Sequence, residues 1–268
     1  MNNIVLSARM QMVADMVTRG NIAADIGCDH GFVSIYLLEQ GICPKVIAMD
    51  VNCGPLLRAK EHVKERGLAE YIDVRLSDGI DQLAAREADS ILIAGMGGRL
   101  IMKILADNMK KAKLLKEVIL QPQSELQMVR QFLIENGFHI IAEDMVKDAG
   151  KYYPVIKAVW KETEPEELTS EQLWFGKLLL KNRHPVLYEY LLKEKAKFKQ
   201  IQKDIADSGS RLQSDDKKDE EWAGKAEESL EEAIQNRKTE DSRLAGIQNR
   251  LCLIDKALAY YNSREEQI

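Results

Sequence analysis

The chain has 268 residues, of which 45% are hydrophobic and 30% are charged. This proportion is enough for a hydrophobic core and excludes a wholly disordered chain. The 38 basic and 43 acidic side chains leave a formal charge of −5, which excludes a uniformly basic nucleic-acid-binding protein but allows a local basic surface.

The cysteine spacing and the first residues of the chain indicate the cellular compartment of the protein. The four cysteines contain no C-x-x-C pair, so we expect no zinc ribbon, no disulfide framework and no metal site. The start, MNNIVLSARMQ, lacks a basic segment followed by an apolar one, which is the pattern of a signal peptide. No stretch approaches the ~20 apolar residues of a membrane helix. We therefore expect a cytoplasmic protein with no membrane partner.

Short β-branched runs alternate with helical stretches through residues 1–160. The predicted strands are Ile22–Ile26, Val46–Val51, Ile72–Leu76, Ser90–Ala94, Glu117–Leu120, Phe138–Met145 and Val155–Trp160. The predicted helices between them are Phe32–Gln40, Leu56–Arg66, Arg99–Asn108 and Glu125–Asn136. The last helix follows Ser124-Glu125-Leu126-Gln127, a sequence typical of a capping box, and ends at Gly137.

This alternation predicts an α/β fold of βαβ units, with a parallel sheet covered by helices on both faces. Between the last two strands we expect only a turn, at Tyr152-Tyr153-Pro154. Parallel strands need a long crossover, so these two are expected to form an antiparallel hairpin at one edge of the sheet.

The remainder of the chain is predicted to be helical. Segment 161–170, KETEPEELTS, is typical of a linker between a domain of residues 1–160 and one of residues 171–268. Apolar residues recur in steps of three and four from Leu244 to Tyr261, and a similar seam runs through Val186–Ile205. We expect a coiled-coil-like antiparallel hairpin with a polar tip at 207–221, and a shorter helix at Glu171–Lys181 packed against it.

Glycines and acids gather where the predicted parallel strands end. The first strand runs into the motif at 25–31, DIGCDHG; the second ends at Asp50; the third runs into Asp78-Gly79 and the fourth into GMGG at 95–98. Ligands of open α/β sheets bind beyond the carboxyl ends of the strands. Glycine lets a ligand approach the backbone, and an acid at the end of the second strand suits a ribose diol.

The acids favour a cationic ligand over a dinucleotide. A G-x-G-x-x-G fingerprint would need glycine where the chain has Asp29 and Phe32, and Asp29 would repel a pyrophosphate. S-adenosylmethionine carries a cationic centre, a ribose and an adenine. Asp25 or Asp29 would face its amine or sulfonium, Asp50 its ribose and Asp78 its adenine amine.

The strings LSARMQMVADMV, ADIGCDHG, DVNCGP, VRLSDGI and ILIAGMGG resemble the bacterial tRNA (adenine-22-N1)-methyltransferase family. The resemblance is close over about residues 1–160 and looser beyond. It implies a Rossmann-like class I methyltransferase domain, a C-terminal helical domain, S-adenosylmethionine as cofactor and tRNA as substrate.

The resemblance also implies roles for individual residues. The methionine part of the cofactor would lie along Asp25, Gly27 and Gly31, the ribose at Asp50 and the adenine at Asp78 and Gly79, while Gly95 and Gly97 would border the reacting centre. Cys28, His30 and Val51 complete the candidate cofactor-binding residues. The chain departs from the family at Asp50, where glutamate is common, and at Cys28, where serine is common. Acidic neighbours are expected to raise the pKa of the Cys28 thiol, so no nucleophile is expected there.

The loop after the fourth predicted strand bears on the reaction. It lacks the Asn/Asp-Pro-Pro-aromatic sequence of enzymes that methylate exocyclic amines. Adenine N1 has an in-plane lone pair and needs alignment and stabilisation of the cationic product rather than proton removal. Asp29 is the candidate catalytic residue, because a carboxylate can accept a hydrogen bond from the adenine amine as charge builds.

A tRNA-binding protein needs local positive potential. Segment 177–203 holds eight basic and two acidic residues, whereas 204–232 holds four basic and eleven acidic residues. The candidate RNA contacts are Arg9, Arg99, Lys195, Lys199 and Lys203. The alternative is that the two segments pair with each other as charged flanks of the hairpin.

Two other functions remain open from the sequence. One is a small-molecule methyltransferase with a dimerising helical tail, and the other is a non-catalytic RNA- or partner-binding module with a degenerate cofactor fold. The sequence leaves the oligomeric state undecided and is compatible with a monomer.

Overall fold

The structure, a computed structural model, describes residues 4–215 and 226–262. The chain folds into two compact units, Met1–Val186 and Leu187–Ile268. The division therefore lies later in the chain than segment 161–170, where the sequence predicts a linker.

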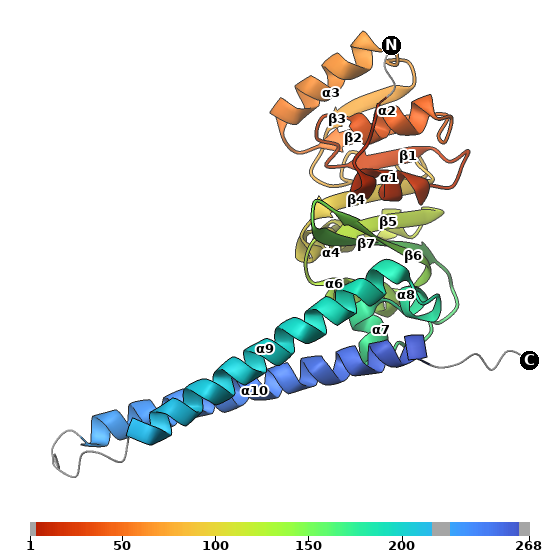
Figure 1. The fold of residues 1–268 in the computed structure, drawn as a ribbon. Coiled ribbons are helices and arrows are strands. Elements are labelled where there is room, and N and C mark those ends of the chain that lie inside the picture. Colours follow the sequence, from red (N-terminus) through yellow and green to blue (C-terminus); the bar gives the residue numbers. More distant parts are fainter. Residues whose placement is uncertain (1–3, 216–225, 263–268) are drawn as a thin grey trace, which may run out of the picture. The chain divides into compact units, whose positions relative to one another are not determined.

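Seven strands of the first unit form one sheet in the order β3-β2-β1-β4-β5-β7-β6 (Figure 1). The strands are β1 Ala23–Ile26, β2 Val46–Asp50, β3 Ile72–Leu76, β4 Ser90–Met96, β5 Glu117–Pro122, β6 Phe138–Asp148 and β7 Lys151–Trp160. The first five are mutually parallel, and β7 runs antiparallel to both β5 and β6. The predicted Rossmann-like sheet with an antiparallel hairpin at one edge is confirmed.

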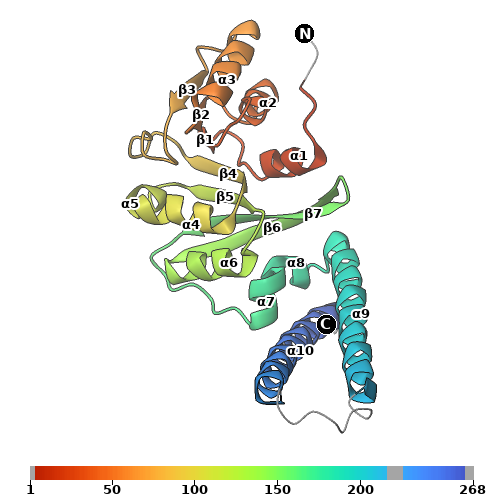
Figure 2. The same cartoon turned by 90° about the vertical axis from the view of Figure 1, so that its left-hand side faces the viewer.

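Helices cover both faces of this sheet, as Figure 2 shows. They are α1 Ala8–Asp15, α2 Phe32–Glu39, α3 Cys53–Glu65, α4 Gly98–Asp107, α5 Met109–Ala112 and α6 Leu126–Glu135. The buried residues of α1, α2 and α3 share one hydrophobic core, and those of α4, α5 and α6 share the other. Every residue of β1, β2 and β5 is buried, as expected of strands covered on both faces.

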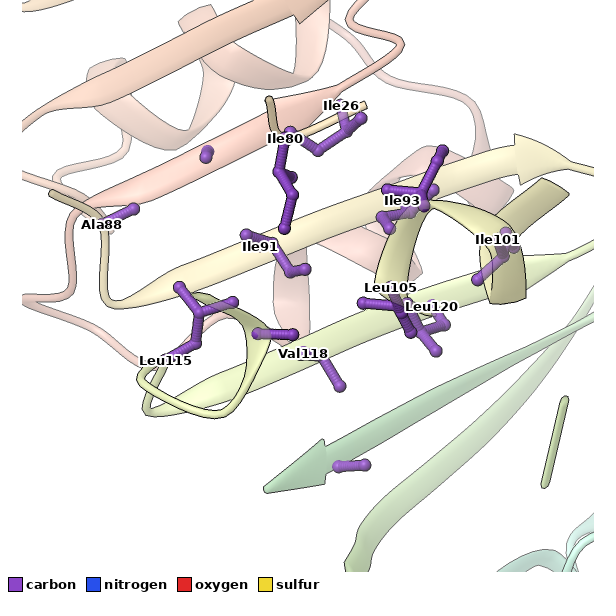
Figure 3. Packing of buried hydrophobic residues seen from close by; sticks show 14 of the residues in the cluster. Ile26, Ile80, Ala88, Ile91, Ile93, Ile101, Leu105, Leu115, Val118 and Leu120 are labelled. Carbon is purple, nitrogen blue, oxygen red and sulfur yellow. The ribbon is translucent and has the colours of Figure 1, made fainter. Parts of the chain in front are cut away.

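Alternate strand residues point to the same face. In the core on the α4 side, Ile91 and Ile93 of β4 lie beside Val118 and Leu120 of β5, with Leu105 of α4 over them (Figure 3). This packing fixes the ends of β4 and β5 relative to each other, and the residues just after them form part of the site described below.

Two local predictions were wrong. The turn between β6 and β7 is at Ala149-Gly150, and Pro154 lies inside β7. Proline is tolerated there because β5 pairs with β7 only from Ile156 to Ala158, so Pro154 has a neighbouring strand on one side only. Ser124 does not cap α6, which begins at Leu126; its hydroxyl accepts a hydrogen bond from Gly98 N at 3.3 Å instead.

The predicted helix at Glu171–Lys181 is two helices, α7 Ser170–Phe175 and α8 Lys177–Lys181, separated by Gly176. Both belong to the first unit, because a buried ion pair links them to the sheet and α6. Arg130 Nε lies 2.8 Å from Glu143 Oε1, and the two side chains are 1% and 0% exposed. Arg130 Nη1 also donates to the Leu173 carbonyl at 2.9 Å, and Glu143 Oε2 accepts from Leu178 N at 2.9 Å.

The second unit contains α9 Pro185–Asp215, nearly all of which lies in it, and α10 Ala226–Asn262. The helices run antiparallel, because the ring of Tyr188 lies 4.9 Å from that of Tyr261 and Lys195 Nζ lies 2.6 Å from Asp255 Oδ1. The predicted helical region is confirmed, but α9 continues to Asp215 through the first part of the predicted polar tip. Extending an existing helix costs little per residue compared with starting one. Residues 216–221, the rest of the predicted tip, lie outside the described residues.

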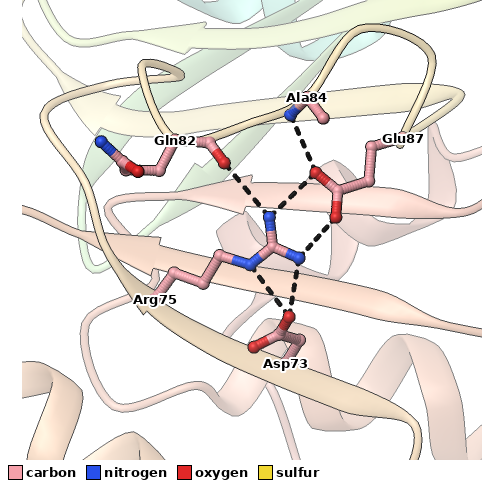
Figure 4. Close-up of polar contacts among 5 residues, drawn as sticks. All are labelled: Asp73, Arg75, Gln82, Ala84 and Glu87. Atoms are coloured by element: carbon pink, nitrogen blue, oxygen red, sulfur yellow. Dashed lines mark hydrogen bonds and ion pairs between the residues drawn. The ribbon is translucent and has the colours of Figure 1, made fainter.

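The segment between β3 and β4 is held by Arg75 (Figure 4). Its guanidinium donates to Asp73 Oδ2 at 2.7 Å, to Glu87 Oε2 at 2.8 Å and to the Gln82 carbonyl at 3.1 Å. Glu87 Oε2 also accepts from Ala84 N at 2.8 Å. These contacts close the loop that begins at the carboxyl end of β3, and the predicted Asp78-Gly79 lies in that loop.

Candidate functional site

The turn from β1 to α2 requires glycine. Gly27 has φ +73°, and a Cβ built there would lie 2.3 Å from Met96 Cε. The N–H groups of Gly27 and Cys28 both donate to the Met49 carbonyl, at 2.8 and 2.9 Å, which binds the turn to the end of β2. Gly31, with φ +75°, ends the turn, and a Cβ there would lie 3.2 Å from Ala59 Cβ. The first glycine motif and the GMGG loop therefore meet at one edge of the sheet.

A cavity of about 250 Å³ opens beside this turn. Five predicted site residues line it: Asp25, Gly27, Cys28, Asp29 and His30. The segment Val5–Ser7 and Met10 line it as well, and the sequence analysis did not place them there. Asp25 and Asp29 give the cavity an acidic lining, which suits a cationic ligand.

Burial changes the acid–base properties of two lining residues. It raises the pKa of Asp25 to about 6, and the charge of Asp50 adds to the effect, while a hydrogen bond from Ser34 Oγ at 2.7 Å opposes it. Burial is also the largest cause of a raised pKa at the Cys28 thiol, with the charges of Asp25 and Asp50 next. Cys28 is therefore a neutral thiol near pH 7, in the direction that the sequence predicts.

Asp50 joins the end of β2 to the first turn. Its Oδ1 accepts from Asn52 N at 2.8 Å and its Oδ2 accepts from Asp29 N at 3.3 Å. A carboxylate has about four acceptor positions, so both oxygens keep lone pairs for further donors such as ribose hydroxyls. Val51, the next residue, is exposed.

Asp29 has left-handed backbone geometry, with φ +50°, which aspartate tolerates better than most residues. Its side chain is 69% exposed, and its Oδ1 lies 3.4 Å from His30 Nε2. Arg58 Nε donates to His30 Nδ1 at 3.1 Å, so the proton of a neutral His30 ring sits on Nε2 and faces Asp29. The His30 ring also stacks on Phe32, which stacks on His62.

The end of β3 lies beside that of β2, because Ser77 N donates to the Asp50 carbonyl at 2.9 Å. The Ser77 hydroxyl donates to the Gly79 carbonyl at 3.0 Å, and Gly79 has φ +54°. A Cβ at Gly79 would lie 2.9 Å from Ile104 Cγ2, so a larger residue would disturb α4. Asp78 is exposed at this turn.

The pairing of β4 with β5 shifts register between Ala94 and Met96, and Gly95, with φ +76°, lies at the shift. Gly95 N donates to Gln121 Oε1 at 3.1 Å, and Arg9 Nη1 donates to the same oxygen at 3.4 Å. The Arg9 guanidinium lies 5.2 Å from the centre of the Tyr153 ring. Gly97 precedes α4, where a Cβ would lie 3.3 Å from Ser124 Oγ.

Sequence reasoning missed Gln121 and Tyr153. The signal for Gln121 was a polar residue directly after the apolar run Val118–Leu120, at a strand end. The sequence predicts a turn at Tyr153, whereas this residue lies in β7, and only the path of β7 brings its ring beside Arg9.

Within the described residues, no group of three or more His, Cys, Asp or Glu side chains is placed to hold a metal ion. Among the same residues, no helix is long and apolar enough to cross a membrane.

Comparison with known proteins identifies the family. The model of a family described as "Methyltransferase domain" matches residues 6–156, which is more than half of the chain. The chain belongs to this methyltransferase family. The match begins just before α1 and ends within β7, so it takes in all four strand ends of the site.

Relatives narrow the family further. The tRNA (adenine(22)-N(1))-methyltransferase of Bacillus subtilis is 37% identical over 158 residues, which are 59% of this chain and 66% of that protein. The crystal structure of the B. subtilis m1A22 tRNA methyltransferase aligns with TM-score 0.74 and 27% identity, over 95% of this chain and 99% of that one.

A Streptococcus pneumoniae structure, of a proposed tRNA (m1A22) methyltransferase in complex with S-adenosyl-L-methionine, aligns with TM-score 0.70 and 30% identity, over 92% of this chain and 100% of that one. The sequence-based assignment to the tRNA (adenine-22-N1)-methyltransferase family is confirmed.

The predicted RNA contacts of this methyltransferase lie in both units. Arg9 belongs to the site, and Arg99, 78% exposed, has its Nε 3.5 Å from Glu125 Oε1. In the second unit Lys195 pairs with Asp255, whereas Lys199 and Lys203 are exposed. The alternative, in which segments 177–203 and 204–232 pair, involves side chains at 208–232 that lie outside the described residues.

Proposed function

We propose that this chain transfers the methyl group of S-adenosylmethionine to N1 of adenine 22 in tRNA, a reaction of the cytoplasm. The observation that carries the proposal is the set of acids and glycines at the ends of four neighbouring parallel strands, with a cavity of about 250 Å³ beside the turn that follows β1. The activity of the B. subtilis relative supplies the acceptor base.

The residues at the strand ends fit this cofactor. An ionised Asp25 attracts a cationic amine or sulfonium, and the turn beside it requires Gly27, because a Cβ there would collide with Met96. The free lone pairs of Asp50 suit the two ribose hydroxyls, and Asp78 with Gly79 lies beside them for the adenine. When bound, the cofactor supplies an electrophilic methyl group on a positively charged sulfur.

Asp29 is the proposed catalytic residue. Adenine N1 attacks through its own lone pair, so the protein has to align the base and stabilise the positive charge that the ring gains. The exposed Asp29 carboxylate is free to accept a hydrogen bond from the adenine amine, which becomes a stronger donor as that charge grows. His30 Nε2, 3.4 Å from Asp29 Oδ1, holds the carboxylate beside the cavity.

The two units have different proposed roles, which are inferred from the charged residues that each exposes. The first unit carries the chemistry, and the second unit, with Lys199 and Lys203 exposed on α9, contacts the phosphates of tRNA. The exposed Arg99, just after the glycine loop, is placed to contact phosphates near the target base.

The test is to incubate the full chain with methyl-labelled S-adenosylmethionine and unmodified tRNA, then digest the RNA and identify the labelled nucleoside. We expect 1-methyladenosine from wild-type tRNA and none from tRNA with guanosine at position 22. Asp29→Ala should lower the single-turnover rate at saturating S-adenosylmethionine by about 100-fold. Label on another nucleoside, or binding of NAD in place of the methyl donor, would refute the proposal.

A further inference from the structure

One buried side chain at the site has an unused hydrogen-bond donor. Gln121, the next-to-last residue of β5, is 0% exposed. Its Oε1 accepts from Gly95 N and from Arg9 Nη1, at 3.1 and 3.4 Å. Both neighbours are donors, so a flipped amide would place N–H against N–H, and the orientation of the amide is fixed.

This orientation leaves Nε2 without an acceptor among the described residues. Buried polar groups are nearly always paired, and an unpaired donor is unfavourable. Gln121 is thus a buried donor at the reacting edge of the sheet that lacks a matching acceptor. A ligand with an acceptor atom would satisfy it.

The groups around Gln121 suit a flat base. The Arg9 guanidinium lies over the Tyr153 ring at 5.2 Å, which makes a planar, cationic and aromatic wall. A Cβ at Gly95 would lie 3.3 Å from Arg9 Nη1 and 3.7 Å from Gln123 Nε2, so further donors surround this glycine. The cavity beside the first turn instead has Asp25 and Asp29 in its lining. One part of the site therefore suits a cation, and the part around Gly95 suits a ligand with acceptor atoms.

We propose that Gln121 binds the target adenine, donating its Nε2–H to a ring nitrogen of the base, with Arg9 and Tyr153 forming the wall against its face. This inference rests on the proposed function. Once N1 faces the methyl group, N3 and N7 are the acceptors that adenine has left, and Gln121 donates to one of them. Because Gln121 Nε2 is buried, the flexible Arg9 side chain shifts to admit the base and then packs against its face.

A single substitution separates this role from a structural one. Gln121→Glu keeps an acceptor for Gly95 N and Arg9 but removes the Nε2 donor. We expect kcat/KM for tRNA to fall about tenfold, and the modified tRNAs described next separate this loss from any effect of the new carboxylate on stability or on S-adenosylmethionine binding. Gln40→Glu, an exposed residue after α2, is the matched control and should leave kcat/KM unchanged.

Modified tRNA tests the contact itself. Wild type and Gln121→Glu are assayed on tRNA carrying adenine, 3-deazaadenine or 7-deazaadenine at position 22. One deaza base should lower the wild-type kcat/KM about tenfold and cause no further loss in Gln121→Glu, because both changes remove the same hydrogen bond.

Two results would overturn the inference: full activity of Gln121→Glu on natural tRNA, or losses that multiply for both deaza bases. Formation of 1-methyladenosine at position 22 by wild type in the same assays keeps the proposed function intact even if the inference fails. Its absence there would count against the proposed function instead.

Discussion

Replacing Glu143 by glutamine should strongly destabilise the first unit. The pair of Arg130 and Glu143 is almost completely removed from solvent, and each carboxylate oxygen accepts one hydrogen bond, from Arg130 Nε at 2.8 Å and from Leu178 N at 2.9 Å. Glu143→Gln removes the negative charge, leaves the guanidinium uncompensated and turns an amide N–H toward one of these donors. Losing one partner of a buried pair costs about 3–5 kcal/mol.

The matched control is Glu87→Gln, the same chemical change at a partly exposed pair. Arg75 and Glu87 side chains are 24% and 26% exposed, so water replaces part of the lost interaction and we expect a cost of about 1 kcal/mol. The assay is urea denaturation of both variants and wild type at neutral pH, followed by hydrogen exchange over residues 170–181. Exchange there should rise in Glu143→Gln, because α7 and α8 depend on the pair. Equal losses of stability in the two variants would refute the reasoning.

Three further predictions concern charge. The hydrogen bonds from Arg75 lower the pKa of Glu87 to about 2, so Glu87 stabilises the fold above its unfolded pKa of about 4.3 and loses this effect as the pH falls toward 2. The difference in unfolding free energy between wild type and Glu87→Gln should therefore narrow between about pH 5 and about pH 2. A constant difference in urea titrations across this range would contradict the prediction. Burial raises the pKa of Asp25 to about 6, so calorimetry should show cofactor affinity falling below about pH 6 as the carboxyl becomes neutral, whereas Asp25→Asn should bind more weakly without this pH dependence. Neutralising Lys199 and Lys203 together should weaken tRNA binding and reduce the slope of log K against log salt by about 0.7–0.9 per lysine, whereas Lys195→Gln, whose ammonium already pairs with Asp255, should change the slope less.

Local sequence patterns were enough to predict most of the fold. The β-branched runs and the helices between them predicted β1 to β5 within about two residues at each end. Strands such as β2 and β5 are buried on both faces and therefore form nearly continuous apolar segments, whereas the edge strand β3 alternates apolar and polar residues. Glycines with positive φ, such as Gly27 and Gly95, were visible because their backbone geometry is rare in other residues. The acids at the strand ends could be assigned to one site for a different reason: a parallel sheet brings the carboxyl ends of its strands to one edge.

Contacts between segments far apart in the chain could not be predicted from the sequence. The pair of Arg130 and Glu143 joins α6 to β6 and also bonds to Leu173 and Leu178, so α7 and α8 belong to the first unit, which ends at Val186. Ser124 lies in a sequence typical of a capping box, yet its hydroxyl accepts a hydrogen bond from Gly98 N, because the ends of β4 and β5 lie side by side.

From its sequence alone, this chain specifies a doubly wound sheet, a helical tail and an acid-rich edge that suits a sulfonium cofactor, since these depend on residues close together along the chain. Only the tertiary structure brought Arg9, Gln121 and Tyr153 together around Gly95, from α1, β5 and β7. Their meeting depends on strand order and on the direction of β7, which are settled by packing across the whole sheet.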